Sequence, residues 1–184
     1  AHIVVSARPS PQAREAASVL QAYIERISGA SLPIRGEGEG VSGTRVLVGQ
    51  SDAVRALGVK VPSGFTYQMN EEGFVIKAVG ENLVLAGNED WSYRGTTYAI
   101  YDFPGPYGEV VPKMETITVE DVDVLERPSF RMRNIWYSGW MPVNQEDSAE
   151  LRRWYDCNKM TSLAGLSLPS DGSIIRLAPP GQYF

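Results

Sequence analysis

Apolar residues recur along the first part of the chain in the pattern of one long amphipathic helix. Between Pro11 and Gly29 they follow three- and four-residue spacing, which gathers them on one face. Ser10 can cap this helix, Pro11 suits its first position and Gly29 ends it. The predicted buried stripe consists of Ala13, Ala16, Ala17, Leu20, Tyr23, Ile24 and Ile27.

Short apolar runs on either side of this helix predict strands at 2–6, 32–36 and 44–49. A short helix is expected near Asp52–Leu57. The strongest strand signal is "GFVIKAVGENLVLAG" at 73–87, where two apolar runs flank the turn-forming Gly80-Glu81-Asn82. Its second arm is almost continuously apolar, which predicts a hairpin in the middle of a sheet. Alternation at Ile117 and Val119 predicts a further extended segment within 115–130.

The stretch "GNEDWSYRGTTYAIYDF" at 87–103 begins with polar, loop-like residues and ends with apolar, helix-like ones. Pro104 and Gly105 are expected to end the helix. Glu89 and Asp90 in the loop suggest the general acid/base pair of a glycosidase. Neighbouring side chains diverge, however, so the better interpretation is structural: the two carboxylates favour the positive end of the following helix.

The resulting order is strand, helix, two strands, hairpin, helix, strand. It predicts an α+β fold, in which a mixed β-sheet carries two helices on one face. Pro128 marks a boundary between residues 1–127 and 128–184. The second part contains a strand (130–137), a helix (about 146–160) and an apolar run (161–168). This is the opening βαβ of a larger domain, because it needs more sheet than the remaining residues supply.

Composition excludes several classes of partner. Apolar residues make up 43 % of the 184 residues and charged residues 21 %, which is typical of a globular protein. The net charge of −5 argues against nucleic acid. No apolar run approaches the roughly 20 residues that span a bilayer, so no membrane partner is expected. The single Cys157 excludes an internal disulfide, and we interpret it as a buried or incidental thiol.

No motif predicts a cofactor or a metal. The glycine-rich "GEGEG" at 36–40 is interpreted as a flexible turn, because Glu37 and Glu39 would repel a phosphate and no helix follows. His2 is the only histidine, which excludes a site built from several histidines within the chain. The aromatic cluster of Trp136, Tyr137 and Trp140, with Arg131 and Arg133 before it, suits either sugar binding or an interface between domains.

Several blocks in order resemble a known family. They are "AREAASVLQAYIERISGASLPI", "VLVG", "EGFVIKAVGENLVLAG", "GTTYAIYDF" and "ITVEDVDVLERPSFRMRN". Together they resemble the non-catalytic N-terminal α/β domain of family 20 β-N-acetylhexosaminidases, family 67 α-glucuronidases and uncharacterised bacterial relatives. The resemblance covers about residues 1–135. It implies that 128–184 begin a catalytic (β/α)8 barrel, that the catalytic carboxylates lie outside this chain, and that the substrate is an oligosaccharide or glycan.

The resemblance also implies a substrate-binding residue. Pro128, Phe130 and Arg133 match a family 20 pattern at the first barrel strand, whose arginine holds sugar hydroxyls, although Asn134 replaces its glycine. Arg133 is therefore the candidate sugar ligand, together with Trp136 and Trp140. The histidines expected near "NKMTSLAGLSL" are missing, which argues against hexosaminidase specificity. A secreted or periplasmic protein is expected. The alternative is a self-standing carbohydrate-binding or protein-interaction module.

Overall fold

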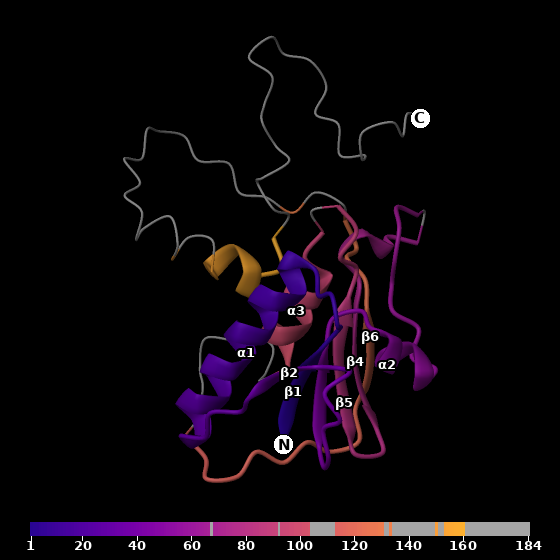
Figure 1. The fold of residues 1–184 in the computed structure, drawn as a ribbon. Coiled ribbons are helices and arrows are strands. Elements are labelled where there is room, and N and C mark those ends of the chain that lie inside the picture. The colour runs from indigo at the N-terminus through magenta and orange to yellow at the C-terminus, as the bar shows by residue number, and fades with distance from the viewer. Residues whose placement is uncertain are drawn as a thin grey trace, which may run out of the picture.

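The computed structural model describes residues 1–66, 68–91, 93–103, 113–130, 133, 150 and 153–160. Within them lies a six-stranded sheet in the order β2-β1-β3-β5-β4-β6 (Figure 1). The strands are β1 (His2–Val5), β2 (Ile34–Gly36), β3 (Arg45–Val48), β4 (Phe74–Val79), β5 (Asn82–Gly87) and β6 (Asp123–Glu126). The helices are α1 (Pro11–Ser28), α2 (Asp52–Ala56), α3 (Gly95–Asp102) and the short 3-10 helix η1 (Asn70–Glu72). We call these strands and helices together the sheet unit.

The sheet is mixed, as predicted. Strands β2, β1, β3 and β5 run parallel, whereas β4 is antiparallel to both β5 and β6. The hairpin β4–β5 therefore has a neighbouring strand on each side, which confirms its predicted place inside the sheet. Alternating side chains point to opposite faces of each strand, so the sheet buries two separate apolar layers.

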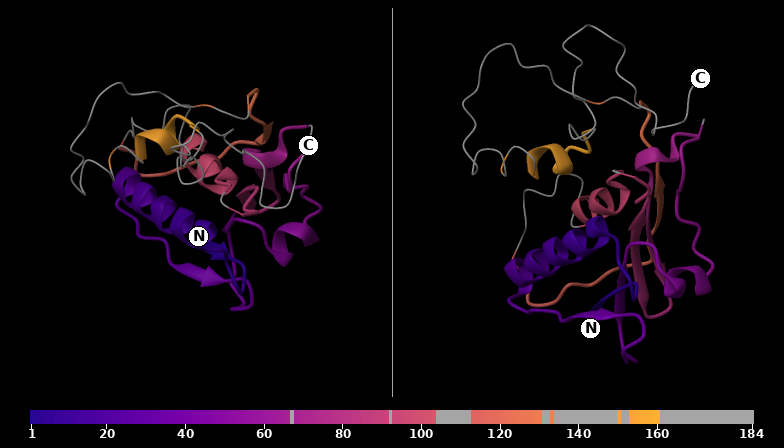
Figure 2. Two further views of the ribbon diagram at one scale, coloured as in Figure 1. Left: turned by 90° about the horizontal axis from the view of Figure 1, so that it is seen from above. Right: turned by 45° about the horizontal axis from the view of Figure 1, so that its top comes forward.

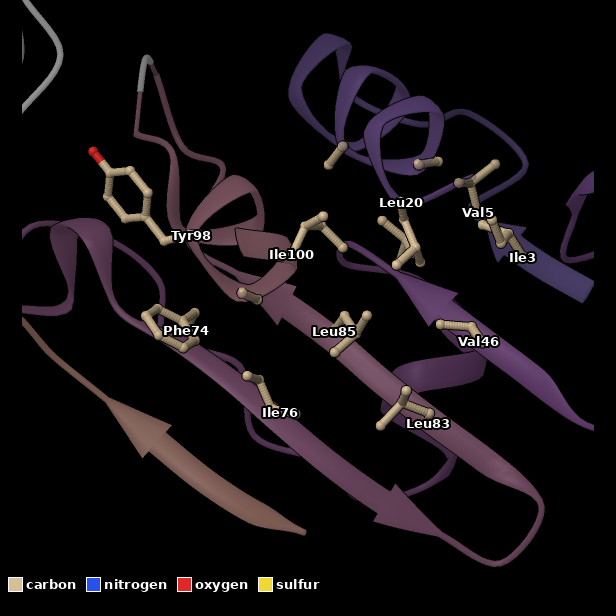
Figure 3. Close-up of a cluster of buried hydrophobic side chains, with 14 of the residues drawn as sticks. Ile3, Val5, Leu20, Val46, Phe74, Ile76, Leu83, Leu85, Tyr98 and Ile100 are labelled. Carbon is tan, nitrogen blue, oxygen red and sulfur yellow. The ribbon is translucent and has the colours of Figure 1, made fainter. Parts of the chain in front are cut away.

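Helices α1 and α3 cover one face of the sheet, and α2 lies on the other (Figure 2). The main core fills the space beneath α1 and α3 and includes Ile3, Leu20, Leu85, Tyr98 and Ile100 (Figure 3). A second cluster, with Val4, Leu47 and Val84 from the strands and Val54 from α2, fills the opposite face. The predicted α+β fold with two helices on one face is confirmed.

Helix α1 follows its sequence signals closely. The Ser10 hydroxyl accepts a hydrogen bond from the Ala13 N–H at 2.9 Å, and Pro11 is the first helical residue. At the other end the Gly29 N–H donates to the Glu25 carbonyl at 2.8 Å. The buried residues of the helix are the predicted stripe without exception: Ala13, Ala16, Ala17, Leu20, Tyr23, Ile24 and Ile27.

Helix α3 begins in direct contact with the end of β5. A Cβ added to Gly87 would lie 2.2 Å from the Gly95 carbonyl carbon, and one added to Gly95 would lie 2.4 Å from the Gly73 carbonyl oxygen. Real side chains never approach so closely, so glycine at both positions lets the two backbones touch. This contact places Tyr98 near Phe74 in the main core (Figure 3).

The last strand lies within the extended segment predicted at 115–130, but later than the alternating residues that suggested it. Its residues are Asp123–Glu126, whereas Ile117 and Val119, whose alternation carried the prediction, are outside any strand. Pairing with β4 sets this position, from Phe74 opposite Glu126 to Lys77 opposite Asp123. Ile117 packs against the core from outside the sheet.

Part of the predicted second domain can be compared with the structure. Residues 150 and 153–157 are helical, within the helix predicted at about 146–160. The strand predicted at 130–137, apart from Phe130 and Arg133, and the apolar run at 161–168 lie outside the described residues, as does the expected barrel opening that they would form. Within the described part of the chain, every helix is too short or too polar to cross a membrane.

Candidate functional site

A pocket of about 360 Å³ lies where the sheet unit meets the residues that follow β6. Glu72 from η1, Phe74 from β4 and Tyr98 from α3 are its most deeply buried lining residues. Arg133 and Lys159 contribute from the later part of the chain. Its more exposed lining residues are Arg127, Ser129, Phe130 and Asn158. We call this the junction pocket.

Arg133, the predicted sugar ligand, lies in the wall of the junction pocket with 19 % of its side chain exposed. Its Nη2 forms an ion pair with the carboxylate of Glu72. Its Nε donates to the Lys159 carbonyl at 2.7 Å, and its Nη1 donates to the Phe130 carbonyl at 2.6 Å. The guanidinium is therefore held on three sides by the protein, and its role toward a sugar stays a prediction.

Glu72 is buried, with 7 % of its side chain exposed. Burial raises the pKa of this carboxyl, and the ion pair with Arg133 offsets part of the rise. The Tyr98 hydroxyl lies 3.3 Å from its Oε1 and donates to the Met160 carbonyl at 2.6 Å. Burial, and next the nearby Glu72 charge, raise the pKa of Tyr98 well above its usual value. This hydroxyl is therefore a neutral donor at any physiological pH.

Lys159 is the centre of a second cluster of charged side chains at the pocket. Its Nζ lies 2.7 Å from Asp102 Oδ1 and 2.9 and 3.0 Å from the two oxygens of Glu126, and it stands over the Phe74 ring at 5.2 Å. Burial alone would lower the pKa of Lys159, but the hydrogen bonds to the two carboxylates outweigh it and raise the pKa. Lys159 thus joins the end of α3 to β6.

A further ion pair fastens the helical residues 153–157 to the start of α3. Arg94 donates from Nε and Nη2 to the two oxygens of Asp156, both at 2.7 Å, and the two side chains are 13 % and 7 % exposed. Burial would lower the pKa of Arg94, but Asp156 outweighs it and raises the pKa. Beside this pair, Cys157 packs against Tyr23 and Tyr101, so it is buried as predicted.

The junction pocket suits binding or support better than proton transfer. Each of its carboxylates, Glu72 and Glu126, faces a cation that balances its charge. General acid/base chemistry in a glycosidase needs two carboxyls that flank the bond to be broken. The exposed aromatic ring of Phe130 and the polar side chains of Arg127, Ser129 and Asn158 are groups that can contact a polar ligand.

Glu89 and Asp90 lie elsewhere, at the carboxyl end of β5. Glu89 accepts hydrogen bonds from the hydroxyls of Ser10 and Thr96, both at 2.6 Å, and from the Gln50 N–H at 3.2 Å. Asp90 accepts one from the Gly64 N–H at 2.7 Å. Glu89 thus joins the starts of α1 and α3, which supports the structural interpretation of this loop.

The remaining predicted features have these positions. The "GEGEG" run forms a turn, in which Glu37 accepts hydrogen bonds from the Ala7 and Ala53 N–H groups. His2 is the first residue of β1. Trp136 and Trp140 lie outside the described residues. Within the part of the chain that the structure describes, no group of three or more His, Cys, Asp or Glu residues is placed to hold a metal ion.

The sequence analysis did not assign the groups that fasten the junction, namely Glu72, Arg94, Asp156 and Lys159. A signal for two of them was present. Arg94 directly precedes the apolar "GTTYAIY", and Asp156 sits among the aromatic and apolar residues of "WYDC". A charge in an otherwise buried segment needs an opposite charge nearby, so these two residues could have been proposed as a pair.

The chain matches no family model and no curated protein. Among solved structures it is similar to a family GH115 4-O-methyl-α-glucuronidase with specificity for decorated arabinogalactans, at 19 % identity and a TM-score of 0.50 over 72 % of this chain. A mutant Streptomyces plicatus β-hexosaminidase with bound product and an N-acetyl-β-hexosaminidase from the same organism each share 15 % identity over 71 % of the chain, with TM-scores of 0.46 and 0.45. The chain spans 18 % of the glucuronidase and 23 % of each hexosaminidase. It therefore shares its fold with part of a glycoside hydrolase.

Proposed function

We propose that this chain is an accessory, non-catalytic unit of a carbohydrate-active glycoside hydrolase, and that a barrel beginning near Pro128 carries the catalysis. One observation carries the proposal: the fold shared with part of a GH115 glucuronidase extends over 72 % of this chain. Because the chain spans only 18 % of that enzyme, the activity, the substrate and a secreted or periplasmic location all belong to the proposal.

The junction gives the accessory role a physical basis. Four ion pairs fasten residues after β6 to the sheet unit: Glu72–Arg133, Lys159–Asp102, Lys159–Glu126 and Arg94–Asp156. Partly buried pairs of this kind fix geometry, since breaking one leaves an uncompensated charge. The sheet unit would thus hold the first elements of the barrel in a defined orientation.

The substrate of the proposed enzyme is an oligosaccharide or glycan, and Arg133, Trp136 and Trp140 are the proposed contacts in this chain. Arg133 and the exposed Phe130 both line the junction pocket, and together they supply hydrogen-bond donors and an aromatic ring to a sugar. The glucuronidase above acts on decorated arabinogalactans, so these glycans belong among the substrates to be tested.

The test is an assay of the natural polypeptide that contains this chain. It is incubated with chromogenic glycosides, including uronides and N-acetylhexosaminides, and with decorated arabinogalactan. We expect hydrolysis of at least one of them. Binding to glycans without hydrolysis would instead identify the self-standing carbohydrate-binding module. If the protein neither binds nor hydrolyses any of these glycans, the proposed role with carbohydrates is wrong.

A further inference from the structure

We propose that Glu72, a residue of the sheet unit, is a positioning residue for Arg133, so that the accessory unit helps to orient a sugar contact of the catalytic unit. This inference rests on the proposed function. Two observations carry it, the geometry around the guanidinium and the burial of the carboxylate.

The guanidinium of Arg133 is held in one plane by contacts from separate parts of the chain. The carbonyls of Phe130 and Lys159 accept from Nη1 and Nε, and the carboxylate of Glu72 pairs with Nη2. Two of these contacts come from residues after β6, whereas Glu72 belongs to η1 of the sheet unit. Because a guanidinium is planar with donors at fixed angles, anchoring three of its nitrogens fixes the orientation of the whole group.

Glu72 is itself held in place. Its side chain is 7 % exposed, and the Tyr98 hydroxyl lies 3.3 Å from Oε1 while Oε2 faces Arg133. Tyr98 is in turn fixed in the core beneath α3. The direction of the Arg133 guanidinium is therefore linked to the core of the sheet unit through two buried side chains.

Stability alone does not account for this arrangement. A buried ion pair is costly to desolvate, and apolar residues of similar volume often serve stability as well or better. A carboxylate at position 72 is, however, a charged hydrogen-bond acceptor, and it can select one orientation of the Arg133 guanidinium, which an apolar side chain cannot do. Glu72 and Arg133 both line the junction pocket, so this orientation is set at the wall of the pocket.

The Arg94–Asp156 pair supplies a matched control. It also joins a charged residue of the sheet unit to the later part of the chain, with the Asp156 side chain 7 % exposed like that of Glu72, but it does not line the junction pocket. Asp156→Asn therefore removes a carboxylate from the junction without touching Arg133. Glu72→Gln makes the same chemical change where Arg133 is affected.

The first arm of the test measures the accessibility of Arg133 in the 184-residue chain. Phenylglyoxal modifies free guanidinium groups, and peptide mass spectrometry gives the rate at Arg133. We expect Arg133 to lose its protection in Glu72→Gln and to keep it in Asp156→Asn. If Glu72→Gln does not fold, Glu72→Asp, which withdraws the carboxylate by one methylene, replaces it, and a partial loss of protection is then expected. Equal rates in the wild type and the folded Glu72 variant would overturn the positioning role.

The second arm measures kinetics in the natural polypeptide. We expect Glu72→Gln to raise KM by about tenfold, the effect of losing one hydrogen bond from a charged group, and Glu72→Asp to restore part of it. Asp156→Asn should lower the melting temperature about as much as Glu72→Gln does, but it should leave KM unchanged. An unchanged KM in Glu72→Gln would show that the Glu72–Arg133 pair has only a structural role. If the wild-type protein hydrolyses none of the substrates, the proposed function is wrong, and so is the role of Arg133 toward a sugar. The labelling experiment would still show whether Glu72 holds Arg133 in place.

Discussion

Tyr98 combines a ring in the core with a hydroxyl that reaches the junction. Tyr98 is 1 % exposed and packs with Phe74 and Ile100 in the core between α3 and the sheet (Figure 3). Its hydroxyl donates to the Met160 carbonyl at 2.6 Å. The side chain thus contributes apolar burial to the sheet unit and a polar contact to the residues that follow it. Truncation to alanine removes both, and we expect a cost of about 3–5 kcal/mol in the free energy of unfolding.

Tyr98→Phe separates the two contributions. It keeps the ring and removes the donor from the buried Met160 contact, so the free energy of unfolding should fall by about 1–3 kcal/mol. Tyr101→Phe is the control, because the Tyr101 hydroxyl has no hydrogen-bond partner among the described residues; a change within about 0.5 kcal/mol is expected. Urea unfolding measures both. Equal, small changes in the two variants would show that the hydroxyl of Tyr98 does not hold the junction.

The burial of Tyr98 could be predicted from the sequence, but its hydroxyl contact could not. Helical spacing within "GTTYAIYDF" shows which residues face a sheet. It carries no information on Met160, which lies 62 residues later. The same separation divides Arg94 from Asp156. Side-chain pairs of this kind depend on how distant elements meet in space, so they follow only from the three-dimensional structure.

The backbone contact between β5 and the start of α3 sets the position of that helix. Gly87 and Gly95 face each other without side chains, and Gly95 also lies against the Gly73 carbonyl. Even one added methyl group would have to displace backbone atoms, which cannot move aside as the end of a flexible side chain can. Helix α3 would then shift relative to Phe74 and to the junction pocket.

Gly95→Ala should therefore destabilise the protein, although alanine is the better helix former. Overpacking against rigid backbone costs about 1–3 kcal/mol or more. Gly38→Ala is the control, since an added Cβ there meets nothing within 4 Å. Thermal unfolding of both variants gives the comparison. A Gly95 variant as stable as the Gly38 variant would contradict the close contact of β5 and α3.

Elements with strong local signals were predicted with close limits, whereas the edge strand β6 was predicted only as part of the longer extended segment 115–130. Helix α1 has a capping serine, a proline at its start and a complete apolar stripe, so its limits and buried face follow from the sequence. Strand β6 is the edge strand beside β4, and its Leu125 is 51 % exposed. An edge strand with one exposed face depends on pairing with its neighbour, which local alternation at Ile117 and Val119 does not reveal.

At the scale of the whole molecule, three buried tyrosines link stability to pH. Burial raises the pKa of Tyr23, Tyr98 and Tyr101 above the usual value of about 10. The folded protein then keeps these protons at a pH at which the unfolded chain releases them. Their contribution is fully present below pH about 10 and is lost as the pH rises beyond it toward the folded-state pKa values.

We therefore expect alkaline unfolding. Above pH about 10, the free energy of unfolding should fall by up to about 1.4 kcal/mol per pH unit for each tyrosine that stays protonated in the fold. Urea midpoints at a series of pH values test this, with Tyr101→Phe as the variant that should flatten the slope. If absorbance showed all nine tyrosines of the native protein ionising near pH 10, the burial of these three would be contradicted.

The surroundings of Arg133 could not be predicted from the sequence, for a physical reason. The resemblance pointed to Arg133, and the structure places this residue at the junction of the two parts of the chain. The residues that line the pocket with it come from η1, β4, α3, β6, the segment at 127–130 and the segment at 158–159, most of which are distant in sequence. A pocket assembled from so many elements has no local sequence pattern, whereas the structural role of Glu89 followed from its place before a helix.

The central claim is that this chain supports hydrolysis and does not perform it. The most direct measurement is the rate at which the purified 184-residue chain releases chromophore from the panel of aryl glycosides. We predict no rate above that of buffer, because Glu72 and Glu126 are paired with cations and Glu89 and Asp90 are hydrogen-bonded to the fold. Turnover that disappears in Glu89→Gln or Asp90→Asn would contradict the claim and make the loop at 88–94 an active site.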